Sequence, residues 1–208
     1  MEISITRALN ELELLDSRIN RAIRESQFST YRKNTATTVL NGRKTVEQFN
    51  EEAKSSLQSI KDLIARRKLI KELIVASNAV TKVTVGEVEM TVASAIERKT
   101  SIGYEKDLLS RLVSSLANAN SQVERDNDRV ESQIQDMNMA YISKDKAVSD
   151  AMLKMNEEYR EQNKSVIVDP LNLESLINTM RKDIEDFENN VDFALSEINS
   201  ITKIVIPD

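Results

Sequence analysis

Basic side chains are concentrated near the start of the chain, between residues 18 and 44. Seven basic residues and one acid lie there, whereas residues 45–208 hold 21 basic and 29 acidic residues. The local excess of six positive charges could attract an anion to a protein whose net charge is −5. The planar fork of arginine suits phosphate oxygens, and an aromatic ring beside it could stack on a base. The candidate contacts are Arg18, Arg21, Tyr31, Arg32, Arg43 and Lys44. A solvated helix face, or salt bridges to an acidic neighbouring helix, would explain the same charges.

A second group of polar and basic side chains lies between residues 78 and 99. Free N–H groups at a helix start favour an anion, and Thr91 directly precedes a helical pattern. Arg98 follows within two turns and could counter a phosphate charge. The candidate contacts are Asn78, Thr81, Thr91, Arg98 and Lys99. The structural alternative is that Thr91 only caps a helix, that Asn78 ends the preceding one, and that Arg98 pairs with nearby acids.

The chain contains no cysteine and no histidine. Disulfides, thiol nucleophiles, cysteine zinc sites and triads with an imidazole base are therefore excluded. An enzyme would have to use Asp, Glu, Lys, Tyr or Ser, or a metal held by oxygen ligands. Acidic clusters such as Glu51-Glu52, Glu157-Glu158 and residues 183–188 lack the spacing of a calcium loop, and solvated helix faces explain them. The sequence thus predicts a protein that is not an enzyme and has no metal or cofactor.

Composition also bears on partners and location. The first residues, MEISITRALNELELL, carry charges throughout, and no apolar run approaches the length of a membrane span. The absence of cysteine fits a reducing cytoplasm, which we expect to be the location. Sequence-independent DNA binders are usually basic overall, whereas this chain has a pI of about 5.1. We therefore expect neither a membrane nor a nucleic acid as the partner.

Apolar residues recur at helical spacing over the first part of the chain. In residues 4–25 they step by three and four, which is the seam of a coiled coil. Residues 27–40 are rich in Thr, Tyr, Phe and Val, which favours extended structure, and Asn41-Gly42 predicts a turn. Thr45 is a candidate cap for a second helix. Arg67 falls on the seam of that helix, which predicts a charge pair across an oligomer interface or a wet gap.

The segment from residue 78 onward interrupts the helical pattern. Residues 80–85 alternate Val and Thr, Gly86 supplies a turn, and residues 88–90 form the return strand. Because an isolated hairpin is marginal in water, residues 201–206 are expected to add a third strand, and residues 27–40 are a further candidate. Apolar residues then predict three helices. The first covers residues 92–141, with a bend near 117–120. The second covers 145–162, with Val148, Met152, Met155 and Tyr159 facing inward, and the third covers 173–198, where Asn172 could cap the start.

These patterns predict a mostly α protein, a long antiparallel coiled-coil-like helical bundle with a small β-sheet. The sheet is expected at about 80–90 and 201–206, with residues 27–40 as a candidate addition. We expect a single elongated domain over residues 1–208, with a small β subdomain near 78–91 and 200–206. Seams on at least four helices exceed what one slender monomer buries, so we expect a homo-oligomer.

One run of residues resembles a known family. Asn78, Thr81, Gly86, Met90-Thr91, Ala95 and Arg98 resemble the core of the septicolysin-like family, small helical proteins of bacteria and bacteriophages. The resemblance covers roughly residues 60–116 and 170–206. Residues 40–64, LNGRKTVEQFNEEAKSSLQSIKDLI, are similar to phage versions of such proteins. The family is one of unassigned activity, so the resemblance implies a helical fold and a bacterial or phage origin and names no reaction.

Three hypotheses for the function follow. The first is an oligomeric, phage-encoded binding protein in the host cytoplasm, which sequesters a small phosphorylated ligand such as an ADP-ribose-type nucleotide immune signal. Such an anti-defence sponge would work by stoichiometry and without turnover. The second is a structural scaffold, in which assembly through the helical seams is itself the function. The third and weakest is a metal-dependent hydrolase with oxygen ligands.

Overall fold

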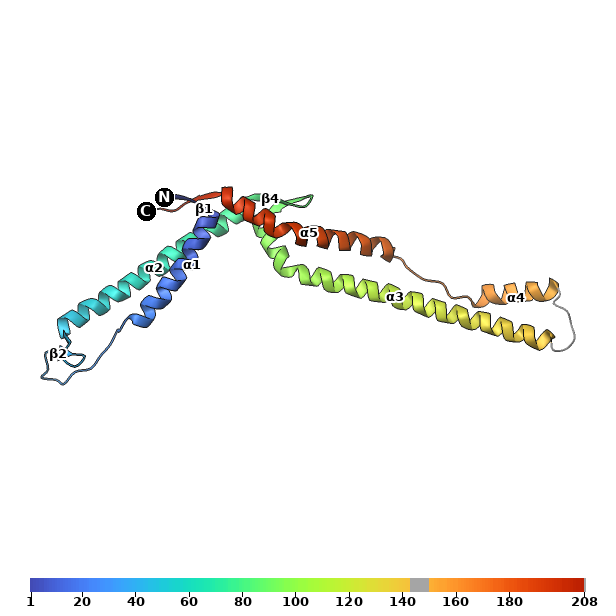
Figure 1. Ribbon diagram of the computed structural model, residues 1–208, viewed down its shortest axis with the longest axis horizontal. Coiled ribbons are helices and arrows are strands. Elements are labelled where there is room, and N and C mark those ends of the chain that lie inside the picture. The colour runs from blue at the N-terminus through green and yellow to red at the C-terminus, as the bar shows by residue number, and fades with distance from the viewer. Residues whose placement is uncertain (143–149, 208) are drawn as a thin grey trace. The chain divides into compact units, whose positions relative to one another are not determined.

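The computed structural model describes residues 1–142 and 150–207, and this part of the chain is mostly helical. In chain order the elements are β1 (Glu2–Ser4), α1 (Ile5–Glu25), β2 (Thr38–Val39), β3 (Lys44–Thr45), α2 (Val46–Val80), β4 (Lys82–Val85), β5 (Val88–Thr91), α3 (Val92–Ile142), α4 (Asp150–Asn163), α5 (Leu173–Ile201) and β6 (Lys203–Val205) (Figure 1). The predicted mostly α fold with a small β component is confirmed. In the described ranges no helix is long and apolar enough to cross a membrane.

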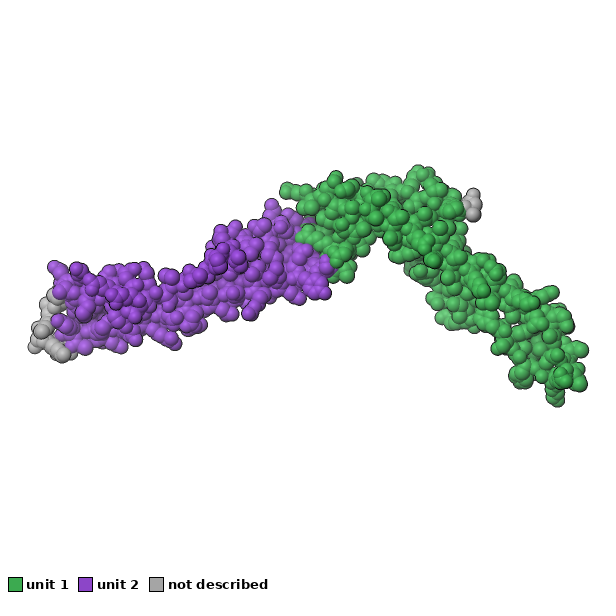
Figure 2. Space-filling model, turned by 180° about the vertical axis from the view of Figure 1, so that it is seen from behind, with its two compact units in different colours: residues 1–100, 187–208 green, residues 101–186 purple. Residues whose placement is uncertain are grey.

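The chain divides into two compact units, which Figure 2 colours separately. Unit 1 contains residues 1–100 and 187–208, and unit 2 contains residues 101–186. Unit 1 therefore holds α1, α2 and all the strands, while unit 2 holds most of α3, α4 and the first half of α5. The single domain expected from the sequence stays a prediction.

The core of unit 1 lies between α1 and α2, which run side by side in opposite directions (Figure 1). The predicted seam of α1 is confirmed, because Ile5, Ala8, Leu12, Leu15 and Ile19 are all buried. Ile70 and Ile74 of α2 pack into the same cluster. Thr45 starts α2 with a capping box, in which its hydroxyl accepts from the Gln48 N–H and the Gln48 side chain accepts from the Thr45 N–H.

The strands form three separate two-stranded sheets, which corrects the single sheet expected from the sequence. Strand β6 pairs with β1 at the chain start and does not join the hairpin β4–β5. The reason is burial, since Ile3, Ile204 and Ile206 complete the α1–α2 core from this small sheet. The N-terminal amine also donates to the Ile206 carbonyl at 2.6 Å, which holds the two ends of the chain together.

Only the end of the 27–40 segment is a strand. Thr38–Val39 pairs with Lys44–Thr45 across the predicted Asn41-Gly42 turn, so this hairpin is its own sheet. The predicted hairpin of β4 and β5 is confirmed, with Val85 opposite Val88 and Gly86 in the turn at a φ of 61°. Val83 and Val85 point inward along β4, as a period of two requires.

In unit 2, α3 and α4 pack against each other through side-chain contacts. Tyr159 donates to Gln133 at 2.7 Å, and the buried Asn156 donates to Asn138 at 2.9 Å. Helix α3 is continuous from Val92 to Ile142, and the bend expected near 117–120 stays a prediction. Met152 is buried as predicted, whereas Met155 is 48% exposed because the helix turns Asn156 into the interface instead. Val148 lies outside the described residues.

The start of α5 is capped differently from the prediction. Asn172 was the expected cap, but the Asp169 carboxylate accepts from the Leu171 N–H at 3.2 Å and the Leu173 N–H at 2.7 Å. Asn172 has a positive φ of 51°, a conformation that asparagine tolerates well. The predicted seam of α5 is confirmed at Ile177, Ile184, Phe187 and Val191, which are buried.

The charge on the α2 seam is paired within the chain. Arg67 donates to both carboxylate oxygens of Asp16 on α1, and its neighbour Arg66 pairs with Glu11 of the same helix. The partner across an oligomer interface that the sequence suggested is therefore not needed to explain Arg67. Its guanidinium lowers the pKa of Asp16, mainly by hydrogen bonding, below the ordinary value of 3.8.

This ion pair predicts a specific pH dependence. Because the pKa of Asp16 is lowered on folding, the pair stabilises unit 1 above the unfolded pKa, and the stabilisation is lost as the pH falls through the folded pKa. Asp16→Asn should therefore lower the urea midpoint at neutral pH and have less effect in acid. Glu13→Gln, on the exposed side of α1, is the matched control. An equal effect of Asp16→Asn at both pH values would contradict the assignment.

Candidate functional site

The predicted contact residues fall into two groups at opposite ends of α2. The first group lies on α1 and on the α1–α2 loop (residues 26–45), and the second lies around the β4–β5 hairpin and the start of α3. Helix α2 has 35 residues, which places its ends about 50 Å apart at the usual helical rise. One pocket in one chain therefore cannot contain both groups.

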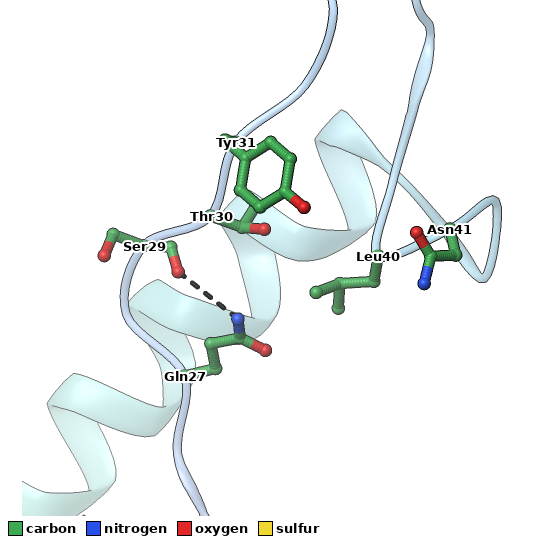
Figure 3. A pocket seen from close by; sticks show the side chains of 6 residues that line it. All are labelled: Gln27, Ser29, Thr30, Tyr31, Leu40 and Asn41. Atoms are coloured by element: carbon green, nitrogen blue, oxygen red, sulfur yellow. Dashed lines mark hydrogen bonds between the residues drawn. The ribbon is translucent and has the colours of Figure 1, made fainter.

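A cavity of about 420 Å³ lies at the α1–α2 loop (Figure 3). Its lining consists of Gln27, Ser29, Thr30, Tyr31, Leu40 and Asn41. The lining is mostly amide and hydroxyl groups, with one aromatic ring and one aliphatic side chain. The Gln27 amide donates to the Ser29 carbonyl at 3.4 Å, which links two residues of the lining. We call this cavity the loop pocket.

The backbone of the turn explains how the loop pocket forms. Leu40, Asn41 and Gly42 have positive φ values of 53°, 57° and 85°. Glycine and asparagine adopt this region readily, whereas a leucine there is strained. The turn is closed by the Gly42 N–H donating to the Val39 carbonyl at 3.1 Å. It directs the Leu40 side chain toward the segment of Gln27 to Tyr31 (Figure 3).

A second cavity of about 310 Å³ adjoins the loop pocket and shares Gln27 and Leu40 with it. It lies between the end of α1, the loop and the first turns of α2. Its lining is Ala22, Glu25, Ser26, Gln27, Leu40, Lys44, Phe49, Glu52 and Ser56. Two carboxylates and one ammonium group line it, so this cavity is acidic, while the loop pocket has no charged lining residue.

The structure separates the predicted basic residues of the first group by what they contact. Arg32 donates to the carbonyls of Asn34 at 2.7 Å and Ala36 at 2.8 Å, so its guanidinium holds the loop in shape. Lys44 forms an ion pair with Glu52. Arg18, Arg21 and Arg43 are exposed, and their guanidinium groups make no hydrogen bond or ion pair to any described residue.

Tyr31 differs from the other aromatic residue of this loop in how far it projects. Its side chain is 90% exposed although it lines the loop pocket, whereas Phe28 is 47% exposed. Its hydroxyl end faces the cavity (Figure 3). A phenol held over a polar cavity offers a flat face for stacking and a hydroxyl for hydrogen bonding.

The second group has structural contacts. The Thr81 N–H ends α2 by donating to Ser77 at 2.9 Å, and the Thr91 hydroxyl accepts from the Ser94 N–H at 3.0 Å at the start of α3. Asn78 is half-buried on the last turn of α2. These contacts match the structural alternative that the sequence left open for Thr91.

The two basic residues of the second group contact α5. The Arg98 guanidinium lies 4.5 Å from the ring centre of Phe187, which is a cation–π contact. Lys99 forms an ion pair with Asp192. Both contacts lie within unit 1 and join α3 to α5, so removing either side chain would act on packing.

Most of the residues that line the loop pocket were not predicted from the sequence. Tyr31 was a predicted contact and Asn41-Gly42 a predicted turn, whereas Gln27, Ser29, Thr30 and Leu40 were not assigned to a site. The available signal was the dense run of amides and hydroxyls before an Asn-Gly turn. Among the described residues no group of three acidic side chains converges as a metal site would require.

Comparisons with protein-family models, with curated proteins and with solved structures find no match for this chain. The resemblance to the septicolysin-like family stays a prediction.

Proposed function

We propose that the protein binds a small phosphorylated ligand that carries an aromatic ring, and that it holds this ligand in the loop pocket without converting it. The observation that carries the proposal is the polar cavity of about 420 Å³ with the exposed ring of Tyr31 at its edge. Cavities of this size are typical of sites for small molecules. Arg43, with its side chain exposed, follows Asn41 of the lining by two residues.

The chemistry of the two adjoining cavities suits a nucleotide of the ADP-ribose type. Tyr31 would stack on the base, and the amides of Gln27 and Asn41 would form hydrogen bonds with its edge. Arg43 would contact phosphate oxygens from outside the cavity. The acidic second cavity would accept hydrogen bonds from ribose hydroxyls through Glu25, because an ionised carboxylate only accepts.

In this proposal the protein acts as a sponge, and its capacity depends on its copy number and its oligomeric state. The lining groups supply stacking and hydrogen bonds, which are sufficient for sequestration. A homo-oligomer encoded by a phage and working in the host cytoplasm against a nucleotide immune signal is the specific form that we propose.

Native mass spectrometry tests the proposal. The purified protein is mixed with ADP-ribose, with AMP, with ribose 5-phosphate and with inorganic phosphate in separate samples. We expect a whole number of ADP-ribose molecules per oligomer, and we expect the same intact ligand after denaturation. Absence of uptake from the whole panel would contradict the proposal, and release of an altered ligand would instead show an enzyme.

A scaffold function is the second candidate, because apolar side chains are exposed along one line of α2. Leu57, Ile64 and Val75 are spaced by seven and eleven residues, which places them on one helix face outside the α1 contact. A scaffold would ignore nucleotides, and its mass would rise only in the presence of a protein partner.

A further inference from the structure

The segment that connects α4 to α5 in unit 2 is apolar, extended and unpaired. Val166, Ile167 and Val168 lie in no helix or strand, and their backbone N–H and carbonyl groups make no hydrogen bond to any described residue (Figure 1). Val166 is 66% exposed and Val168 is 88% exposed. Unpaired β-branched segments of this kind are templates for pairing with another strand.

Contacts at both ends hold this segment in place. The Asn127 side chain of α3 accepts from the Ser165 N–H at 2.8 Å and donates to the Ser165 carbonyl at 3.2 Å. At the other end, the Asp169 carboxylate binds the N–H groups at the start of α5. The three residues between these anchors are therefore presented in a fixed place at little further entropic cost.

The anchor at Ser165 also determines which backbone groups face outward. Along an extended chain the N–H and carbonyl groups of successive residues point to alternate sides. Because those of Ser165 point to α3, those of Val166 and Val168 point away from it, while those of Ile167 point toward it. The outward edge thus offers two donors and two acceptors.

We propose that this edge pairs with the same edge of a second copy of the chain, in an antiparallel sheet with a two-fold axis at Ile167. Val166 of each copy then exchanges two hydrogen bonds with Val168 of the other, and the two Ile167 residues face each other as a non-hydrogen-bonded pair. The sequence Val-Ile-Val reads the same in both directions, so the contact is self-complementary, as a two-fold interface requires.

Charge selects the antiparallel arrangement. Lys164 and Asp169 flank the segment at its two ends, and Lys164 also forms an ion pair with Glu161 of its own chain. Antiparallel pairing about Ile167 brings the lysine of one copy near the aspartate of the other, whereas parallel pairing in register would set like charges side by side, which is unfavourable. The inference rests on the homo-oligomer of the proposed function and not on its ligand.

Cysteine cross-linking tests the pairing. Native disulfides cannot interfere, because the chain has no cysteine of its own. The two Cα atoms of a non-hydrogen-bonded pair are about 4.5 Å apart, within the range that a disulfide spans. Ile167→Cys should therefore form a disulfide-linked dimer on mild oxidation about tenfold or more faster than Tyr104→Cys, because pairing raises the effective thiol concentration. Tyr104 is the control because it is 80% exposed on α3 of the same unit.

Two further samples test the register. Val166→Cys mixed with Val168→Cys should give the mixed dimer, because these two positions face each other in the antiparallel sheet. Val166→Cys alone should cross-link no faster than Tyr104→Cys. Unchanged far-ultraviolet circular dichroism confirms that each variant is folded.

Two results would overturn the inference. The first is cross-linking of Ile167→Cys at the rate of the Tyr104→Cys control, which would mean that another protein or no partner covers the segment. The second is fast cross-linking of Val166→Cys alone, which would indicate parallel pairing. Binding of ADP-ribose by the Ile167→Cys protein, measured beside these samples, separates a failure of the interface from a failure of the ligand proposal.

Discussion

Replacing Ile70 by alanine is expected to lower the free energy of unfolding of unit 1 by about 2–5 kcal/mol. Ile70 is fully buried between α1 and α2, in a cluster with Leu12 and Leu15 from the facing helix. The substitution removes three carbon atoms and leaves a cavity, because a two-helix interface with a narrow seam has few neighbouring side chains that could fill it.

Urea unfolding followed by circular dichroism measures this effect. Ile64→Ala is the matched control, since it makes the same substitution in the same helix at a side chain that is 46% exposed. We expect the control to change the free energy of unfolding by less than about 1 kcal/mol. Equal losses for the two variants would mean that the α1–α2 interface is not the core of unit 1.

Replacing Tyr31 by alanine is expected to weaken ADP-ribose binding by about 5- to 150-fold, because stacking of a base on an aromatic ring contributes about 1–3 kcal/mol. The side chain is 90% exposed, so its loss removes little packing and the fold should be retained. The effect is therefore expected on affinity and not on stability.

Isothermal titration calorimetry of the two proteins with ADP-ribose measures the change. Tyr104→Ala is the control, because it removes a tyrosine of α3 that is 80% exposed and should bind as the unchanged protein does. Tyr31→Phe keeps the ring and should retain most of the affinity. Full affinity in Tyr31→Ala would remove this residue from the site.

The helices were predictable because their periodicity extends over many residues. The seam positions of α1 and α5 are buried as their spacing predicts, and the capping residue Thr45 begins α2 as expected. A pattern repeated over four or more turns is a strong signal. The hairpin of β4 and β5 was predictable too, because alternating Val and Thr residues precede a glycine turn there.

Strand partners were not predictable, because a strand of two or three residues carries almost no pattern. Glu2–Ser4 shows one inward residue, Ile3, and nothing in its sequence indicates that β6 will pair with it. Pairing there depends on the packing of α1 against α2, which places both ends of the chain at the same core. That information is tertiary and cannot be derived from local preference.

The site was predicted only in part for a related reason. Arg32 and Lys44 were predicted as ligand contacts because of their charge. In the structure Arg32 donates to loop carbonyls, and Lys44 forms an ion pair with Glu52. The side chains that line the loop pocket are mostly neutral and polar, and such residues are common in any loop. Their convergence depends on the left-handed turn at Leu40, which a leucine does not signal.

Hydrogen–deuterium exchange with and without ADP-ribose tests whether the loop pocket binds the ligand, because the exchange rates report both binding and its position in the chain. We predict slower exchange in peptides that cover residues 26–45 and unchanged exchange in peptides from unit 2. Protection confined to other parts of the chain would move the site away from the loop pocket. Unchanged exchange everywhere at a saturating ligand concentration would contradict the binding function itself.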